Sequence, residues 1–68
     1  MRLIPARIGD SGEDVSWAQQ VLGIAPATGQ FDRSTEARLK GFQWAIGIKV
    51  TGMLDPKTVE ELRIQELR

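Results

Sequence analysis

Residues 31–62 carry the clearest pattern of hydrophobic and polar positions in the chain. At the centre of this stretch a threonine and three apolar residues follow one another at intervals of four, three and four residues: Thr35, Leu39, Phe42 and Ile46. This spacing places the four side chains on one face of a helix. Asp32 stands at the N-cap position, and Gly47 stands where a left-handed residue commonly ends a helix. The pattern predicts a central helix over residues 33–46.

A first helix is expected over about residues 12–22. The sequence from Ser11 to Asp14, Ser-Gly-Glu-Asp, fits a helix start, and Gly23 is expected to end the helix. Its inward face is expected to contain Val15, Ala18, Gln19 and Leu22. Residues 1–9 are interpreted as an extended lead-in, with Ile8 packed under this helix.

A third helix is expected over about residues 56–66. Asp55 occupies the N-cap position, and Pro56 occupies the first helical position, where its missing N–H leaves no hydrogen bond unmade. Val59 and Leu62 are expected to face the core. This helix therefore starts in the same way as the central helix, with an aspartate cap.

An internal repeat relates the two halves of the chain. Eight residue types recur in the same order: Gln19, Gly23, Ile24, Thr28, Gly29, Asp32, Thr35 and Leu39 correspond to Gln43, Gly47, Ile48, Thr51, Gly52, Asp55, Thr58 and Leu62. Because one such unit cannot bury its own apolar stripe, both units are expected to share the central helix as a common wall. The prediction is an all-α fold, a compact three-helix domain over residues 1–68 built as a pseudo-repeat of helix-loop units with two structured Thr-Gly loops.

Composition narrows the range of functions. The chain has 68 residues, enough for one small domain. It contains no cysteine and no histidine, so it has no disulfide and lacks the commonest metal ligand and general base. Nine Lys and Arg residues balance nine Asp and Glu residues, and this zero net charge argues against a nucleic-acid binder. The first ten residues contain no apolar run long enough for a signal peptide or membrane helix, so no membrane contact is expected.

The acidic pairs Glu13-Asp14 and Glu60-Glu61 are candidates for acid–base chemistry. Catalysis by two carboxylates requires groups that face each other across a cleft. Adjacent residues of a helix do not face each other, so these pairs are interpreted as solvent-exposed helical turns. We therefore predict that the chain is not an enzyme and has no cofactor and no metal site.

The two tryptophans point away from the predicted core stripes. Trp17 lies about 200° around its helix from Val15, and Trp44 lies about 200° from Phe42, at ~100° per residue. An exposed tryptophan often marks a contact surface, such as a stacking platform for a sugar or for a partner's side chain. Alternatively, both rings cover the flank of a very small core, with Trp17 lying over the N-terminal lead-in. The sequence leaves both interpretations open.

Several polar side chains have a structural and a binding interpretation. Gln19 and Gln43 occupy equivalent places in the repeat, at the edge of the inward face, where an amide commonly satisfies loop backbone groups. Three basic residues give the central helix a flank that could meet anionic groups: Arg33, Arg38 and Lys40. Glu36 offers Lys40 an ordinary helical ion pair instead.

These motifs resemble the peptidoglycan-binding domain family, the three-helix type often attached to bacterial and phage cell-wall hydrolases. The resemblance rests on SGEDV followed by Gln19 and Leu22, on TGQFD with Thr35, on the pair Phe42-Gln43 and on VTGMLDPKT with Leu62. The element TG-x-[FL]-D-x-x-T occurs twice with the FQ pair between its copies, which is a specific signal. The chain departs from the family's usual pattern at Ala18, where leucine is usual, and at Trp44, where a small or polar residue often stands.

The resemblance implies a non-catalytic cell-wall binding module that anchors a lysin or hydrolase to murein in the bacterial cell wall or periplasm. Synthesis in the cytoplasm from a phage gene would fit as well. The ligand would be a peptidoglycan glycan strand or stem peptide, and a catalytic hydrolase domain would be a partner. The two Thr-Gly loops and the adjoining helix ends are expected to line the binding groove. The residues expected to bind the ligand are Gln20, Arg33, Gln43 and Trp44.

Two other functions stay open. A small interaction protein could keep this fold and use Trp17 and Trp44 to bind another protein or a second copy of itself. A helix-turn-helix DNA-binding protein could use residues 33–46 as its recognition helix. The zero net charge and the eight-residue loop at residues 24–31 argue against DNA binding.

Overall fold

The structure is a computed structural model that describes residues 5–68. It contains three α-helices in the order α1 (Glu13–Val21), α2 (Arg33–Ile46) and α3 (Pro56–Glu66). Within these residues extended segments pair only as isolated bridges, and no strand is formed. The all-α, three-helix prediction is confirmed. The predicted bounds of α2 and α3 agree with the structure, and α1 is one residue shorter at each end than predicted.

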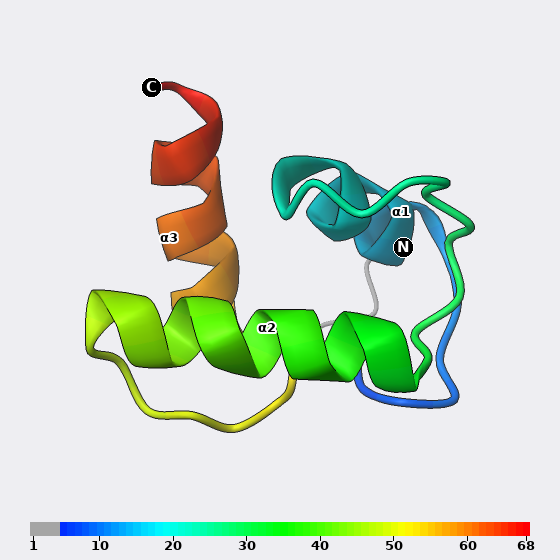
Figure 1. Cartoon of the computed structure of the whole chain (residues 1–68), viewed down its shortest axis with the longest axis horizontal. Helices are drawn as coiled ribbons and strands as arrows, with labels where there is room; N and C mark the ends of the chain where they lie inside the picture. Colours follow the sequence, from blue (N-terminus) through cyan, green and yellow to red (C-terminus); the bar gives the residue numbers. More distant parts are fainter. Residues whose placement is uncertain (1–4) are drawn as a thin grey trace.

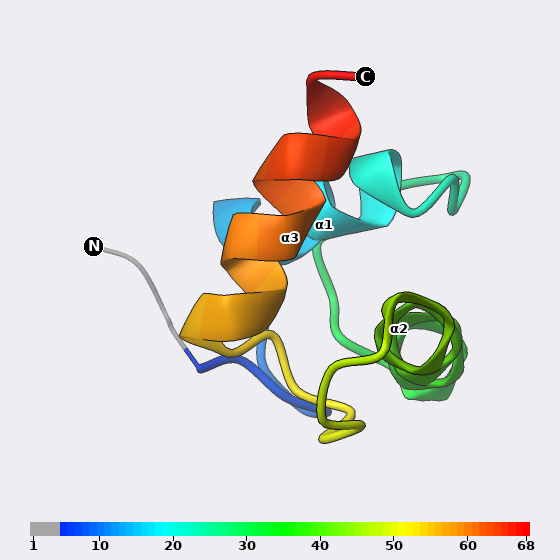
Figure 2. The same ribbon diagram turned by 90° about the vertical axis from the view of Figure 1, so that its left-hand side faces the viewer.

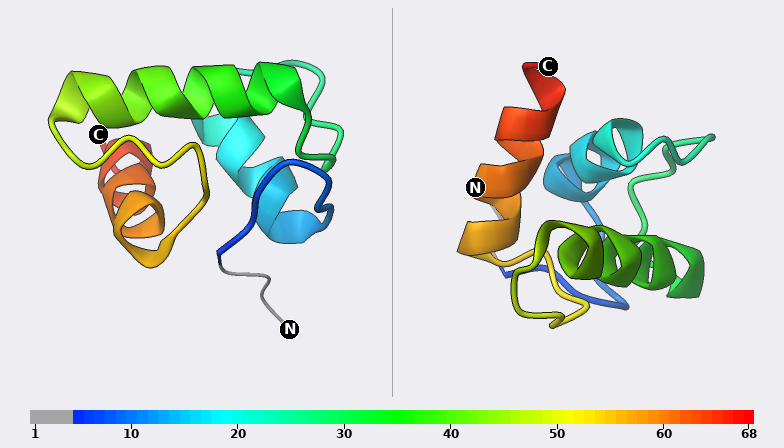
Figure 3. Two further views of the ribbon diagram at one scale, coloured as in Figure 1. Left: turned by 90° about the horizontal axis from the view of Figure 1, so that it is seen from below. Right: turned by 60° about the vertical axis from the view of Figure 1, so that its left-hand side comes forward.

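The helices α1 and α3 lie on the same side of α2 (Figure 1, Figure 3). The longest helix, α2, runs across the molecule, whereas α3 rises steeply from near one of its ends and α1 packs beside α3. Figure 2 views α2 along its axis and shows that it forms one wall of the described chain. The described residues have nearly equal extents of 25 × 23 × 23 Å, and each of the three helices contributes buried apolar residues to one core.

The core is small and contains equivalent residues from both repeats. Its buried apolar residues are Ala6, Val15, Ala18, Phe31, Leu39, Leu54 and Leu62. Phe31 and Leu54 each stand directly before an aspartate cap, and Leu39 and Leu62 are also equivalent in the repeat. The two units therefore bury a shared core that neither could bury alone.

The buried face of α2 differs from the prediction. Its buried residues are Thr35, Leu39 and Gln43, spaced four residues apart. Phe42 is half-buried and Ile46 is 39% exposed, so the predicted stripe through these two residues is only partly right. The difference arises because the amide of Gln43 is hydrogen-bonded inside the fold, which turns that side of the helix inward and leaves Phe42 at the edge.

Both predicted aspartate caps are confirmed. The carboxylate of Asp32 accepts a hydrogen bond from the backbone N–H of Thr35 at 2.9 Å. The carboxylate of Asp55 accepts the equivalent bond from Thr58 at 2.8 Å, and Pro56 is the first residue of α3. Each cap satisfies one of the backbone donors that a helix start leaves without an internal partner.

The predicted glycine endings of α1 and α2 are also confirmed. Gly23 and Gly47 have left-handed φ values of 77° and 79°. After each glycine the next residue donates its N–H to a carbonyl of the last helical turns: Ile24 to Gln19 at 2.8 Å and Ile48 to Gln43 at 3.1 Å. This is the Schellman ending, in which a residue without a Cβ suits the left-handed position best.

The start of α1 differs from the prediction. Its N-cap is Gly12, and no side chain caps the helix, so the Ser-Gly-Glu-Asp sequence does not act as a capping box. Ser11 lies one residue before the N-cap position. It is held there because it is bridged to Gln30 and because the N–H of Gly12 donates to the carbonyl of Gly29 at 2.9 Å. The φ of Gly12 is 148°, a value that favours glycine at this position.

The segment before α1 joins the two loops. Ala6 exchanges two backbone hydrogen bonds with Leu54, at 3.1 and 2.7 Å, and the N–H of Gly9 donates to the carbonyl of Phe31 at 2.9 Å. Ala6 is fully buried, whereas Ile8 is 41% exposed, so the prediction that Ile8 packs under the first helix is wrong. Residues 8 and 9 form a turn that carries Ile8 away from the core. Residues 1–4 of the predicted lead-in lie outside the described residues.

Candidate functional site

Gln43, in the second half of α2, is fully buried and holds the second Thr-Gly loop. Its Oε1 accepts a hydrogen bond from the N–H of Gly52 at 3.0 Å. Its Nε2 donates to the carbonyl of Met53 at 3.1 Å and to the hydroxyls of Thr51 and Thr58 at 3.0 and 2.8 Å. The amide therefore links α2 to the loop and to the first turn of α3.

Gln19, in α1, does the same for the first Thr-Gly loop. Its Oε1 accepts from the N–H of Gly29 at 2.8 Å, and its Nε2 donates to the carbonyl of Gln30 and to the hydroxyl of Thr35, both at 2.9 Å. The structural interpretation of both glutamines is confirmed. No buried side-chain nitrogen or oxygen of the described residues lacks a hydrogen-bond partner, so the scaffold leaves no buried polar group for a ligand.

The outer face of α2 presents Arg33, Lys40 and Trp44, all of which are exposed. At ~100° per residue these positions lie within about 40° of one another around the helix axis. Arg33 and Trp44 are about 16 Å apart along the axis, at ~1.5 Å per residue. Trp44 is 78% exposed. This face combines one aromatic ring with two cations on a rigid element.

Trp17 has a different environment from Trp44. Its indole N–H donates to the carboxylate of Glu66 at 3.0 Å, and the guanidinium carbon of Arg63 lies 5.7 Å from the ring centroid. The ring is half-buried and packs against the core. The flank-covering interpretation therefore applies to Trp17, although the ring lies against α3 rather than over the lead-in.

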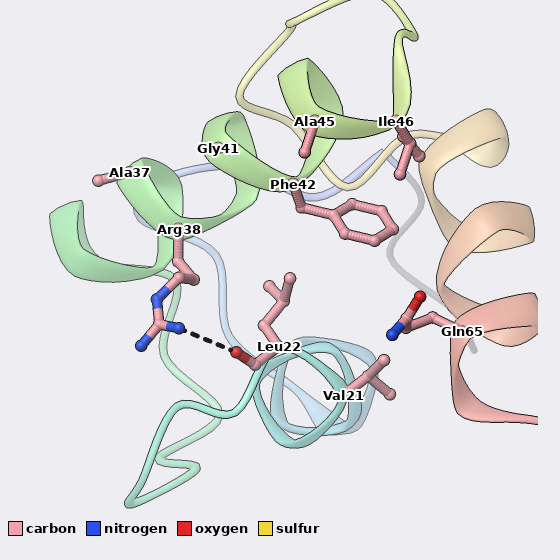
Figure 4. A pocket seen from close by; sticks show the side chains of 9 residues that line it. All are labelled: Val21, Leu22, Ala37, Arg38, Gly41, Phe42, Ala45, Ile46 and Gln65. Atoms are coloured by element: carbon pink, nitrogen blue, oxygen red, sulfur yellow. Dashed lines mark hydrogen bonds between the residues drawn. The ribbon is translucent and has the colours of Figure 1, made fainter. Parts of the chain in front are cut away.

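An open groove of about 430 Å³ lies between the end of α1, α2 and α3 (Figure 4). Its apolar walls are Val21, Leu22, Phe42 and Ile46. Figure 4 shows the ring of Phe42 reaching into the space between the three helices. Along one side the lining residues of α2 are small and four residues apart: Ala37, Gly41 and Ala45. This side of the groove is therefore low and open.

Two polar side chains border the groove. Arg38 donates from Nη1 to the carbonyl of Leu22 at 3.2 Å, which fixes its guanidinium beside the groove (Figure 4). The amide of Gln65 faces the groove from α3. Arg38 is the one charged residue of the nine that line the groove, so the lining carries a positive charge and no carboxylate.

The structure separates the four predicted site residues. Arg33 and Trp44 share the outer face of α2, whereas Gln20 is exposed on α1 and does not line the groove. Gln43 is fully buried and its amide is bonded within the fold, so it is a scaffold residue and not a surface contact.

The position of the groove differs from the sequence-based expectation. The sequence predicts a groove lined by the Thr-Gly loops, but the observed groove is lined by helices and by the residue that follows α1. One sequence signal indicates the observed groove. Small residues stand at every fourth position of α2, at Ala37, Gly41 and Ala45, beside Arg38. A helix face of small residues leaves room beside it.

Hydrogen bonds lower the pKa of both capping carboxyls. The backbone N–H and the hydroxyl of Thr35 stabilise the carboxylate of Asp32 and hold its pKa below the ordinary value. Burial raises the pKa of Asp55, but hydrogen bonds from Thr58 and Thr51 outweigh this effect, so its pKa is also lowered. Both caps are therefore charged at neutral pH.

The acidic pair Glu60-Glu61 has a cationic neighbour on α3. Lys57 forms ion pairs with Glu60 at 3.2 Å and with Glu61 at 3.4 Å, so this acidic pair has a surface partner on its own helix. Residues 5–68 contain no cluster of three or more His, Cys, Asp or Glu that could hold a metal ion. Over the same residues, none of the helices has the length and apolar character that spanning a bilayer requires.

Comparison with known proteins identifies one family. The family model "Putative peptidoglycan binding domain" matches residues 11–62. No curated protein and no solved structure matches the chain. The matched range contains both Thr-Gly loops, both buried glutamines and the whole of α2. Since the match covers most of the sequence, the chain belongs to the peptidoglycan-binding domain family.

Proposed function

We propose that the chain is a non-catalytic module that holds a lysin or hydrolase on murein, in the bacterial cell wall or periplasm. Family membership supplies the class of ligand. The observation that carries the proposal is the outer face of α2, where Trp44 is 78% exposed on a helix whose opposite face is fixed in the core. A large aromatic ring left in water on a rigid element is a typical stacking platform.

Each proposed contact has a chemistry that suits murein. Trp44 would stack on the face of an amino sugar, and Arg33, about 16 Å away along α2, would bind a carboxylate further along the polymer. Gln20, exposed on α1, would offer its amide to polar groups of the ligand. Gln43 would act indirectly, by holding the second Thr-Gly loop against α2.

Weak binding at one site is enough for this role. Murein repeats the same units along a polymer, and a tethered module gains from the high effective concentration of neighbouring sites. Trp44 and Arg33 lie on an exposed helix face and not in a deep cavity, which suits a long polymer that approaches from the side. An attached hydrolase would supply the chemistry that the described residues lack.

Retention on purified peptidoglycan sacculi tests the proposal. We expect the wild type to be retained, and Trp44→Ala to weaken retention roughly three- to tenfold through the lost stacking contact. The matched control is Leu67→Ala, which removes another strongly exposed apolar side chain, 86% exposed, outside this face. Arg33→Ala tests whether the cation on this face contributes to retention, and Lys57→Ala, which removes a cation on α3, is its control. If folded wild-type protein is not retained, the proposal is wrong.

A second candidate function is self-association through Trp44. The same 78% exposure favours it, because a second copy could cover the ring. Trp17 supports this candidate less, since its indole is already bonded to Glu66. Light scattering over a range of concentrations distinguishes the two functions. A dimer that Trp44→Ala abolishes, without retention on sacculi, would favour self-association.

A further inference from the structure

We propose that the groove between α1, α2 and α3 binds the stem peptide of peptidoglycan, with a carboxylate of the peptide on Arg38. A stem peptide is a short chain with small apolar groups and free carboxylates. The inference rests on the proposed function and adds which portion of murein enters the groove. The glycan strand would stay on the outer face of α2, against Trp44.

The walls of the groove suit apolar groups of modest size. Val21 is the last residue of α1, Leu22 follows it, and Phe42 and Ile46 come from α2 (Figure 4). The volume of about 430 Å³ lies within the range of roughly 300–1,000 Å³ that is typical of small-ligand pockets. Methyl and methylene groups of a short peptide would lose contact with water there. The hydroxyl groups of a sugar would instead lose hydrogen bonds, so the groove favours the peptide over the glycan.

The charge of the groove selects an anionic ligand. Arg38 is its one charged lining residue, and no carboxylate lines it. The hydrogen bond from Nη1 to the carbonyl of Leu22 holds the guanidinium in place at 3.2 Å. A guanidinium has five N–H donors, so further donors can bind a carboxylate. The amide of Gln65, on the opposite side of the groove, can bond the peptide backbone (Figure 4).

Gly41 shows where the peptide would cross α2. Glycine inside a helix is unfavourable relative to alanine, yet a Cβ at this position would meet no atom within 4 Å. Packing of the described residues therefore does not require a glycine here. Ala37, Gly41 and Ala45 form a strip of small residues along α2. Trp44 lies about 60° from Gly41 around the helix axis. A stem peptide attached to a sugar on Trp44 could pass over this strip into the groove.

Filling the groove tests the inference without loss of the fold. Gly41→Leu places a side chain in the groove and improves the helix propensity of α2, so the variant should stay folded. We expect it to bind a synthetic murein tetrapeptide at least tenfold more weakly than the wild type by calorimetry or chemical-shift titration. The matched control is Glu60→Leu, which adds a leucine at an exposed site of α3 outside the groove. Equal tetrapeptide affinity of Gly41→Leu and wild type would overturn the inference.

The charge is tested separately. Arg38→Gln removes the guanidinium and should weaken tetrapeptide binding roughly tenfold, through the loss of a charge-assisted hydrogen bond. The loss should be largest at low salt. The control is Arg7→Gln, which removes an exposed guanidinium outside the groove lining. If Arg38→Gln and Arg7→Gln bind the tetrapeptide equally, Arg38 is not the carboxylate partner.

Binding measurements on sacculi, on the tetrapeptide and on glycan strands without peptides distinguish this inference from the proposed function. Wild-type protein that is retained on sacculi but does not bind the tetrapeptide would overturn the groove assignment and leave the proposed function standing. Wild-type protein that is not retained on sacculi would overturn both. Equal binding to glycan strands stripped of their peptides and to intact sacculi would overturn the groove assignment by placing recognition on the sugar alone. A concentration-dependent dimer that Gly41→Leu abolishes would identify a second copy, and not the peptide, as the occupant.

Discussion

One glutamine amide closes each Thr-Gly loop. Gln43 bonds the N–H of Gly52 and the carbonyl of Met53, which are backbone groups that no helix or sheet satisfies. It also bonds the hydroxyl of Thr58 in the first turn of α3. An apolar side chain of similar size would fill the same space but would leave these groups buried without partners. At the scale of the residue, polar contacts of a buried amide thus hold each loop beside its apolar anchor, Phe31 or Leu54.

Gln43→Leu is expected to lower the free energy of unfolding by roughly 2–4 kcal/mol, because buried donors and acceptors lose their partners. Urea denaturation followed by circular dichroism measures this change. Gln20→Leu is the control, since Gln20 is exposed on α1, and it should shift the unfolding midpoint very little. Equal midpoints for both variants would show that the amide of Gln43 does not hold the loop.

The aspartate caps make stability depend on pH. Both carboxyls have a pKa below their ordinary value of 3.8 in the folded state, so folding favours the ionised form. Their contribution is present above the unfolded pKa and is lost as the pH falls through the lower folded pKa. We expect the melting temperature to drop as the pH falls below about 4. In the double variant Asp32→Asn, Asp55→Asn this drop should be smaller, since asparagine caps a helix without a titrating charge.

At the scale of the element, α2 has three sides with different tasks. One side is buried through Thr35, Leu39 and Gln43. A second side lines the groove, with Phe42 at the border between groove and core. The third side is exposed and presents Trp44. A single amphipathic pattern describes only the first side, so the other two follow from how α1 and α3 are placed around the helix.

Leu39→Ala and Phe42→Ala should separate the first two sides. Leu39 is buried, and its truncation is expected to cost about 2–5 kcal/mol, enough to unfold much of a small domain. Phe42→Ala should cost less than the roughly 3–5 kcal/mol of a fully buried phenylalanine, since its ring borders an open groove. Thermal melts of both variants measure the difference. A larger loss for Phe42→Ala than for Leu39→Ala would contradict the observed burial.

At the scale of the whole molecule, the sequence predicts the helices well because their signals are local. Asp32, Asp55, Gly23 and Gly47 each determine a helix end through contacts close in the sequence. The repeat also predicts the equivalent roles of the two glutamines. The pattern at Ser11 misleads, because its bridge to Gln30 is a contact between distant segments, which no local pattern reveals.

The candidate site is harder to predict for the same reason. Periodicity predicts Trp44 as a surface residue, and the structure places Arg33 and Trp44 on one exposed face. The groove depends on the angle between helices and on residues from three elements, so the small residues Ala37, Gly41 and Ala45 of α2 indicate only one of its sides. For Gln43 the sequence allows both a ligand contact and a loop support, and periodicity cannot distinguish these roles at the edge of a helix face.

The segment before α1 ties the two repeats together. Ala6 is fully buried and bridged to Leu54, while Gly9 bonds to Phe31. Ala6→Asp would bury an unpaired carboxylate and is expected to cost roughly 3–5 kcal/mol, which would unfold much of the protein. Arg7→Asp, at the exposed neighbouring position, should leave the melting temperature nearly unchanged. A folded Ala6→Asp variant with a wild-type melting temperature would show that this segment is not inside the core.

At two loop positions, Gln30 and Met53, the buried glutamines bond only the backbone carbonyl: Gln19 bonds Gln30, and Gln43 bonds Met53. The side chains at these two positions take no part in that hydrogen bonding, so many residue types should be accepted there. Libraries diversified at both positions could therefore add new specificities at the loop surfaces while the scaffold keeps its shape.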